Sequence, residues 1–558
     1  MVESRISNNG IFRREKIEMR KVVRTPDFPI VDTPSGKLHG FLDNDVYHFY
    51  GIRYATAGRF EMPRPVPAWE GVKDAKAYGY ICPLLPEDPH AEGDPNGAPE
   101  NSFEMPHVYW PMSENCQYLN VWTRHINEPA NRPVLVWLHG GGFCSGSSIE
   151  IPAYNGHNLA ASSDVVVVNL NHRLNVLGFL DLSSFGEKYA SAGILGMEDI
   201  VTALRWVREN IAAFGGDPDN VTVAGQSGGG GKAAALLQMP EADGLYSKVI
   251  IESGATGNVN GQQMTGGEAK TADPDDSILS EGLLEEKRKW QRLGERTVEM
   301  LNLNKDSIDE MKTVPYHLLA DAATEAAKSL HMPTGMMMLE PSPVAGRYIG
   351  RYFEAGFREE TRNIPMIIGT TLGEFTFMHD LGNKDLFSEE EKMDILRQNL
   401  GSKTDEIVKE FHRVYPDKDI LYAMSADTKF KRQAYLMSSS RAAWTDAPVY
   451  CYQMNLIVPY MGGLALWHCG EIPFVFRNAE MEPVQCTGDY LEDVQDLVSG
   501  AWTAFMQSGN PSTDRFAWKP FTTREHHLAF LDEKPEMVLE DDEKLVNLLA
   551  SVRPPFLA

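Results

Sequence analysis

The stretch that decides the fold of this chain is Val221-Thr-Val-Ala-Gly-Gln-Ser-Gly-Gly-Gly-Gly-Lys-Ala-Ala-Ala-Leu-Leu237. It begins with a short β-branched run, passes through the pattern Gly-x-Ser-x-Gly, and continues into Ala and Leu, which favour helix. A turn this sharp between strand and helix needs glycine on both sides of the serine, because a Cβ there would collide with neighbouring backbone. We therefore predict a nucleophile elbow that presents Ser227 at a helix N-terminus.

A phosphate-binding loop is the alternative for the glycine run that ends at Gly231-Lys232. The first glycine of that motif would fall on Gln226, and Ala233 stands where a Ser or Thr should bind magnesium. The sequence therefore does not favour a nucleotide site.

A second glycine motif, His139-Gly-Gly-Gly-Phe143, directly follows the apolar run 133–138. Successive glycines let backbone N–H groups point into a cavity without side-chain obstruction. Such donors stabilise the oxyanion that forms during ester hydrolysis, by roughly 3–4 kcal/mol each. We predict donors from Gly141, Gly142 and Gly228, with a plain glycine loop as the alternative.

Short apolar runs on both sides of the elbow predict buried parallel strands. Between them lie helical patterns, clearest in 197–213, where apolar residues recur at helical spacing. Strands that alternate with helices indicate an α/β protein with a mostly parallel central sheet. Residues 274–331 read instead as helix without strand, so we predict a helical insertion over the sheet. The predicted strands are 133–138, 165–168, 221–224, 248–251 and 365–368.

The composition of the chain narrows the classes of molecule that the protein is expected to bind. The 558 residues include 52 Lys and Arg against 78 Asp and Glu, a formal net charge of −26, which argues against nucleic acid. No apolar run reaches the length of about 18 residues that would predict a membrane span. The six cysteines form no Cys-x-x-Cys pair and no His-Glu-x-x-His occurs, so neither a metal nor a cofactor is predicted.

The chain resembles the type-B carboxylesterase family, which includes cholinesterases and bacterial p-nitrobenzyl esterases. The resemblance runs from about residue 33 to 520 and includes four ordered segments. These segments are Tyr50-Gly-Ile-Arg-Tyr-Ala55, Ser113-Glu-Asn-Cys-Gln-Tyr-Leu-Asn-Val-Trp122, Phe214-Gly-Gly-Asp-Pro218 and Ser508-Gly-Asn-Pro511. It implies an α/β-hydrolase fold in which a sheet flanked by helices carries a cap of helical insertions over the active site. It also implies a Ser/His/Glu triad, with the acid between the nucleophile and the histidine in chain order.

The resemblance assigns the other two triad members. Gly369-Thr-Thr-Leu-Gly-Glu-Phe375 is similar to the family's acid segment, which makes Glu374 the acid. His468-Cys-Gly-Glu471 is similar to its histidine segment, which makes His468 the base. Asp380 is the rival for the acid, and His379, His526 and His527 are the rivals for the base.

The elbow departs from the family's commoner Glu-Ser-Ala-Gly, because Gln226 and Gly228 flank Ser227. Gln226 removes a negative charge beside the nucleophile, which weakens any expectation of cholinesterase-like cation binding. Ser253 matches a family serine that supports the triad acid, with a simple turn residue as the alternative. Cys82 and Cys116 match positions that the family often bridges by a disulfide, and two free thiols are the alternative.

These observations predict a serine carboxylesterase that acts through an acyl-enzyme on neutral short- to medium-chain esters. The alternatives are a lipase or sterol esterase, a selective amidase, and a non-catalytic binding protein on a hydrolase scaffold. The predicted domains are a weakly structured arm over 1–30 and one hydrolase domain over 31–558, with a helical cap at about 256–345. The predicted partner is a small-molecule ester, and the protein is expected to be a monomer or a homodimer. A cytoplasmic location is expected because residues 1–30 show no secretory pattern. Met332 and Met336 to Met338 either line the acyl or alcohol pocket or fill the core.

Overall fold

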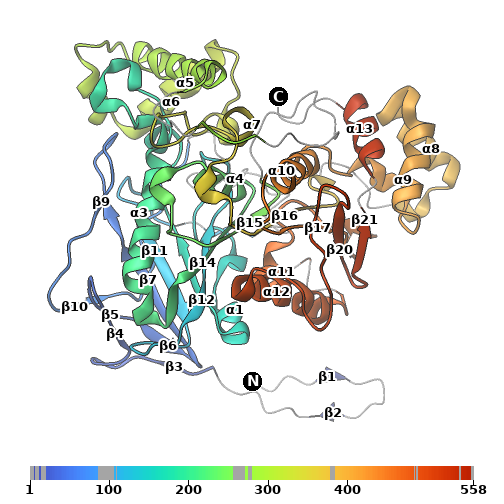
Figure 1. Ribbon diagram of the computed structural model, residues 1–558, viewed down its shortest axis with the longest axis horizontal. Coiled ribbons are helices and arrows are strands. Elements are labelled where there is room, and N and C mark those ends of the chain that lie inside the picture. Colours follow the sequence, from blue (N-terminus) through green and yellow to red (C-terminus); the bar gives the residue numbers. More distant parts are fainter. Residues whose placement is uncertain are drawn as a thin grey trace.

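A twelve-stranded sheet with helices on both faces forms the centre of the computed structural model (Figure 1). The structure describes residues 5–6, 12–13, 20–85, 106–108, 110–254, 270–273, 279–376, 384–460, 462–482, 484, 488–539 and 542–553. No helix in these ranges is both long and apolar enough to cross a membrane.

The middle of the sheet is parallel throughout, which confirms the predicted α/β class. Each predicted strand is present, with bounds that differ by a few residues because strand ends extend into the flanking turns. In spatial order the predicted strands are β13 (Val166–Leu170), β12 (Arg132–Leu138), β14 (Gly216–Gln226), β15 (Lys248–Glu252) and β16 (Met366–Thr371). Two further parallel strands, which were not predicted from the sequence, follow β16: β17 (Val449–Met454) and β20 (His527–Leu531).

Antiparallel strands extend both edges of this parallel centre. They are β21 (Glu536–Leu539) at one edge and β11 (Tyr118–Thr123), β7 (Val46–Arg53), β6 (Phe41–Asp43) and β3 (Val22–Val23) at the other. Small separate sheets contain β1 (Arg5–Ile6) with β2 (Phe12–Arg13), β4 (Ile30–Thr33) with β5 (Gly36–His39) and β10 (Val72–Asp74), β8 (Ala55–Thr56) with β9 (Arg64–Pro65), and β18 (Ile457–Val458) with β19 (Leu464–Ala465).

Part of the segment for which a weakly structured arm was predicted joins the sheet. β3 pairs with β6, and the Arg20 guanidinium donates from Nε to both carboxylate oxygens of Asp43 at 2.8 Å. Asp43 is fully buried, so this pairing compensates a charge that would otherwise be costly to bury.

The sheet is buried on both faces, since alternate residues of one strand enter two different cores. In β12, Val134 and Val136 pack into one cluster, and Leu135 and Trp137 pack into the other. The first face is covered by α3 (Leu195–Asn210), α4 (Gly228–Leu236) and α10 (Phe430–Trp444), and the second by α1 (His157–Ser163), α11 (Ile472–Phe476) and α12 (Leu491–Ser508). The helix predicted over 197–213 ends at Asn210 and continues as a 3-10 turn.

The predicted helical insertion lies outside these layers, at the top of Figure 1. Its described part contains α5 (Glu281–Met300) packed against α6 (Tyr316–Ser329), followed by a 3-10 turn at Gly335–Met337. Further helices are α2 (Asn175–Gly178), α7 (Tyr352–Ala355), and the neighbouring α8 (Glu389–Leu400), α9 (Thr404–Val414) and α13 (Glu543–Val552).

The strand register brings the predicted motifs to one edge of the sheet. Leu138 at the end of β12 pairs with Gly225, Gln226 pairs with Glu252, and Glu252 pairs with Gly369. Parallel strands place their carboxyl ends together, and ligands of α/β sheets bind at that edge. The glycine loop, the elbow and the acid segment therefore converge although they are far apart in the chain.

Candidate active site

Ser227 lies at the sharp turn between β14 and α4. Its φ of 57° and ψ of −124° form a left-handed, strained conformation, as a nucleophile elbow requires. The Ser227 N–H donates to the Glu252 carbonyl at 2.8 Å, and the Ser227 carbonyl accepts from Gly231 N–H at 3.0 Å. The serine is half-buried, and its hydroxyl bonds to no residue that the structure describes, so it is open to a substrate.

The glycines around Ser227 allow backbone to pack directly on backbone. A Cβ added at Gly229 would lie 1.9 Å from the Leu138 carbonyl oxygen. A Cβ at Gly228 would lie 2.1 Å from the carbonyl oxygen of Gly142 and 2.4 Å from its nitrogen. The departure from the family's alanine therefore has a physical reason, since the glycine loop occupies the space that an alanine methyl would need.

Glu374 and His468 form a hydrogen-bonded acid–base pair. Nδ1 of His468 lies 2.5 Å from Oε2 of Glu374, and the His468 backbone N–H donates to the Glu374 carbonyl at 2.7 Å. Oε1 of Glu374 accepts from Ser253 Oγ at 2.7 Å and from the Thr371 N–H at 2.8 Å. Glu374 is fully buried, so these donors replace the water that a carboxylate would otherwise bind.

Gln226 connects this pair to the elbow. Its side-chain nitrogen lies 3.3 Å from Nδ1 of His468, and its side-chain oxygen accepts from Cys469 Sγ at 3.0 Å. Because Gln226 directly precedes Ser227, the imidazole lies beside the nucleophile's turn. No hydrogen bond between Ser227 and His468 occurs among the described residues, and a catalytic bond of this kind often forms only once substrate is bound.

Two neighbouring phenylalanines, whose ring centroids are 6.1 Å apart, pack against the His468 ring. The rings of Phe430 and Phe375 stack on the imidazole at centroid distances of 5.0 and 5.5 Å. Both phenylalanines are half-buried, so they also form apolar walls next to the base.

The glycine loop has the properties of an oxyanion hole. Gly141 and Gly142 have φ of 79° and 60°, which only glycine adopts readily. Gly140 N–H faces the Tyr154 hydroxyl at 3.4 Å, whereas the N–H groups of Gly141 and Gly142 donate to no described residue. As the first residue of α4, Gly228 also has an N–H without an intrahelical partner. These three donors remain available for an anion.

Burial raises the pKa values of three carboxyl groups near the elbow and the acid segment. Burial raises the pKa of Glu252 to about 8, and the hydrogen bond from Trp502 Nε1 at 2.8 Å offsets this only in part. Burial, together with the charges of Glu252 and Glu374, raises the pKa of Glu471 well above its ordinary value. Burial and the nearby Glu374 charge raise the pKa of Asp427 to about 6. Glu252 and Glu471 therefore add little negative charge to the site at neutral pH.

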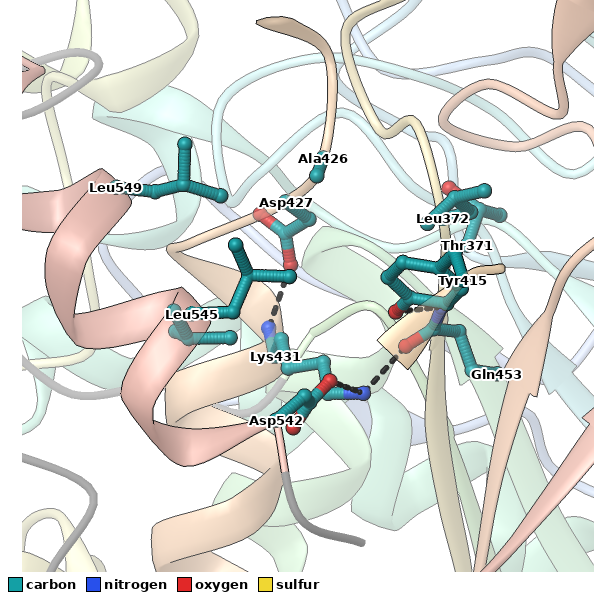
Figure 2. Close-up of a pocket in the computed structure, with 11 residues that line it drawn as sticks. Thr371, Leu372, Tyr415, Ala426, Asp427, Lys431, Gln453, Asp542, Leu545 and Leu549 are labelled. Carbon is teal, nitrogen blue, oxygen red and sulfur yellow. Dashed lines mark hydrogen bonds and ion pairs between the residues drawn. The ribbon is translucent and has the colours of Figure 1, made fainter. Parts of the chain in front are cut away.

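A small pocket with polar and apolar side chains adjoins the acid segment, and none of the three triad candidates lines it (Figure 2). In it, Lys431 Nζ contacts Asp542 Oδ2 at 2.7 Å, and the Lys431 backbone N–H donates to Asp427 at 2.5 Å. Thr371, which lines the same pocket, donates to Glu374. Its lining is connected to Glu374 through the Thr371 backbone N–H, and Ser227 is not among the residues that line it.

The rival residues from the sequence lie elsewhere or outside the described residues. His379 and Asp380 fall outside them. His526 stacks on Phe521 with ring centroids 4.5 Å apart, and His527 pairs with Glu525 at 3.2 Å. Neither histidine contacts the elbow.

Of the two alternatives for Cys82 and Cys116, the structure has the free thiols, both buried, and not the disulfide that the family often forms. Burial and a hydrogen bond with Cys82 raise the pKa of Cys116 well above its ordinary value. The Cys116 thiol therefore stays protonated at neutral pH.

One described group could hold a metal ion, and it is remote from the elbow in the sheet order. Ligand atoms of Asp43, His48 and His157 lie within 4.8 Å of one another, and His48 Nε2 is 3.0 Å from His157 Nδ1. The guanidinium of Arg20 already neutralises Asp43, so we assign this group to packing of the N-terminal strands.

Several residues at the site could not be identified from their own motifs. Asp427 precedes α10 and Phe430 is its first residue, and neither belongs to a recognisable motif. In the sequence, Lys232 stands out only as part of the rejected phosphate-binding loop. The sequence signal for Lys232 is its position, four residues after Gly228 in the glycine-rich start of α4.

Comparison with known proteins finds similarity along most of the chain. A model of the carboxylesterase family matches residues 27–547. The para-nitrobenzyl esterase of Bacillus subtilis is 33% identical over 522 residues, which cover 92% of this chain and 96% of that protein. The phenmedipham hydrolase of Pseudarthrobacter oxydans is 30% identical over 514 residues, 88% of this chain and 93% of that protein. The structure of an esterase from Clostridium hathewayi that can hydrolyse aliphatic aromatic polyesters superposes with a TM-score of 0.83 at 35% identity, covering 96% of this chain and all of that one.

Proposed function

Because this chain belongs to the carboxylesterase family, we propose that it hydrolyses uncharged short- to medium-chain carboxylic esters through a triad of Ser227, His468 and Glu374. The chain is a serine carboxylesterase with the α/β-hydrolase fold. The triad, the acyl-enzyme and the substrate class are the proposal.

The observation that carries the proposal is the 2.5 Å contact between His468 Nδ1 and Glu374 Oε2 beside the strained elbow. A carboxylate on Nδ1 keeps the proton of neutral imidazole on that nitrogen and leaves Nε2 as the proton acceptor. The same carboxylate stabilises the imidazolium that forms when Nε2 takes a proton.

In the proposed mechanism, Ser227 Oγ attacks the ester carbonyl carbon as His468 Nε2 removes the hydroxyl proton. The carbonyl electron pair moves onto oxygen, where the N–H groups of Gly141, Gly142 and Gly228 stabilise it. The tetrahedral species collapses, the C–O bond to the alcohol breaks, and His468 gives the proton to the departing alcohol. Water then attacks the acyl-enzyme by the same route, which releases the acid and restores Ser227.

The walls of the site support uncharged substrates. Phe375 and Phe430 pack against the base. The 46% exposed Met336 lies beside the glycine loop, since a Cβ at Gly142 would be 2.5 Å from the Met336 carbonyl oxygen. Gln226 carries no charge, so a cationic substrate would find no carboxylate from that residue. Hydrolysis of aliphatic aromatic polyesters by the Clostridium hathewayi esterase supports aromatic esters as a substrate class.

The test is a series of initial rates on p-nitrophenyl esters from acetate to palmitate, for the wild type, Ser227→Ala and Ser162→Ala. Ser162 is exposed and bonds only within α1 and to its neighbour, so its variant is the matched control. We expect fast turnover of the short esters, lost by several orders of magnitude in Ser227→Ala alone. A preference for palmitate would favour a lipase, and ester turnover that survives Ser227→Ala would contradict the triad.

A further inference from the structure

Lys232 is a buried lysine whose hydrogen bonds go to the glycine loop. Its side chain is fully buried, and Nζ donates to the carbonyl of His139 at 3.0 Å and to that of Gly140 at 3.4 Å. No carboxylate of a described residue lies within ion-pairing distance of it. Burying an ammonium without such a partner is costly, so the contact with the loop calls for a functional reason.

The two bonds constrain the direction of an N–H group in the loop. A trans peptide is planar and holds its C=O and the following N–H on opposite sides. If the Gly140 carbonyl faces Lys232, the N–H of Gly141 must face the other way, toward the open side of the loop. His139 Nδ1, 3.0 Å from the same carbonyl oxygen, acts in the same direction.

The position of Lys232 in α4 explains how it reaches the loop. It follows Gly228 by four residues, about one helical turn, and helical side chains lean toward the N-terminus of their helix. Its Nζ therefore points toward the end of α4 that carries Ser227 and the Gly228 N–H. A Cβ at Gly229 would lie 2.9 Å from the His139 carbonyl oxygen, which shows how closely α4 approaches the loop.

We propose that Lys232 is a positioning residue of the oxyanion hole, which holds the carbonyls of His139 and Gly140 so that the Gly141 N–H points at the developing oxyanion. This inference rests on the proposed function, because it concerns the donors of that same reaction. Lys232 touches neither the substrate nor Ser227, and it acts through the backbone of the loop.

The charges around Lys232 are compatible with this role. Burial lowers the pKa of Lys232 to about 7, although Glu150 and the Cys144 thiol act in the opposite direction. Burial and the Lys232 charge hold the pKa values of His139 and His172 well below their ordinary value. Both the ammonium and the amine keep at least two N–H bonds, so either form can hold both carbonyls.

The experiment compares Lys232→Met with Lys248→Met in the full-length enzyme. Lys248 is also buried, bonds to Ser247 Oγ and contacts Asn220, and lies at the opposite end of β15 from the site. We would measure kcat and KM on p-nitrophenyl butyrate, and the inhibition constant of a trifluoromethyl ketone with a matched acyl chain. That inhibitor places an oxyanion in the hole when Ser227 adds to it, so its affinity reports the donors directly.

We expect Lys232→Met to lower kcat and to raise the inhibition constant of the ketone by a similar factor, on the order of 10²-fold, with KM nearly unchanged. Lys248→Met should change both by less than about threefold, because its contacts lie outside the site. If Lys232→Met does not fold, Lys232→Leu, which also lacks donors but is smaller, is measured instead. Equal ketone affinities in the folded Lys232 and Lys248 variants would overturn the inference.

The same assays separate this inference from the proposed function. Ester turnover that persists in Ser227→Ala would refute the proposed nucleophile, whatever the result for Lys232→Met. Turnover that depends on Ser227 but is indifferent to Lys232→Met would refute only the positioning role.

Discussion

Nδ1 of His468 lies 2.5 Å from Oε2 of Glu374, and the other oxygen of Glu374 accepts two hydrogen bonds from Ser253 and the Thr371 backbone. The Glu374 carboxylate thus orients the His468 imidazole with one oxygen and is itself held by hydrogen bonds to the other. The pair should therefore be sensitive to substitutions that change these hydrogen bonds without changing side-chain volume.

Glu374→Gln tests the tautomer that the pair selects. A glutamine can turn an NH2 group toward Nδ1, which favours the tautomer with its proton on Nε2 and removes the proton acceptor. We expect kcat to fall on the order of 10⁴-fold, with a much smaller change in KM. Steady-state kinetics on p-nitrophenyl acetate measure this, and a thermal melt checks that the fold is retained. A variant within tenfold of wild-type kcat would exclude Glu374 as the acid.

Ser253→Ala tests the support of the acid. It removes the 2.7 Å bond to Glu374 but leaves the Thr371 N–H in place. Loss of one donor to a buried carboxylate costs about 1–3 kcal/mol, so we expect a fall in kcat of about tenfold and a lower melting temperature. The exposed Ser162→Ala is the control for both measurements. If Ser253 is only a turn residue, stability alone will change and kcat will not.

Gly228→Ala restores the family's commoner residue and is nevertheless expected to harm the enzyme. The new methyl would lie 2.1 Å from the Gly142 carbonyl oxygen, so the oxyanion loop must shift. We expect kcat to fall on the order of 10²-fold and stability to fall by about 1–3 kcal/mol. Kinetics and urea unfolding measure the two effects.

Gly282→Ala is the matched control for that substitution, because nothing lies within 4 Å of a Cβ at Gly282, near the start of α5. Alanine favours helix over glycine, so this variant should keep full activity and lose no stability. Undiminished activity of Gly228→Ala would mean that the loop is looser than its packing against α4 indicates.

The parts of the site that were predicted from local patterns are those whose constraints act within a few residues. The strain at Ser227 and the free N–H groups of Gly141 and Gly142 follow from glycine placement next to a strand end. Glu374 and His468 are 94 residues apart, so no local pattern relates them, and only the family resemblance indicated both.

The contacts that the sequence did not predict depend on which helices and loops pack together in the fold. Phe430 reaches His468 from the start of α10, and the role of Lys232 depends on the approach of α4 to the glycine loop. The disulfide between Cys82 and Cys116 was left open against two free thiols, because a family resemblance does not say whether two neighbouring thiols are oxidised. The sheet was easier to predict, because buried parallel strands require apolar runs on both faces.

Glu252→Gln tests the buried carboxyl beside the elbow through the pH dependence of stability. The pKa of Glu252 is raised to about 8 from an ordinary value of 4.5, so between these values the folded protein binds more protons than the unfolded chain. Stability from this group is therefore present at low pH and is lost as pH rises through that window. A glutamine does not titrate, and its oxygen can still accept from Trp502 Nε1. The substitution also removes the Glu252 charge, which raises the pKa of Glu471.

We therefore expect the free energy of unfolding of Glu252→Gln to exceed that of the wild type at pH 8.5, and the difference to shrink toward pH 5. Urea unfolding at the two pH values measures it, with Glu390→Gln on the exposed surface of α8 as the control that removes a carboxylate without changing the buried one. An equal loss of stability between pH 5 and 8.5 in the wild type and in Glu252→Gln would show that Glu252 ionises without penalty. The site would then carry a full negative charge next to Ser227, and the preference for uncharged esters would have to come from the aromatic walls alone.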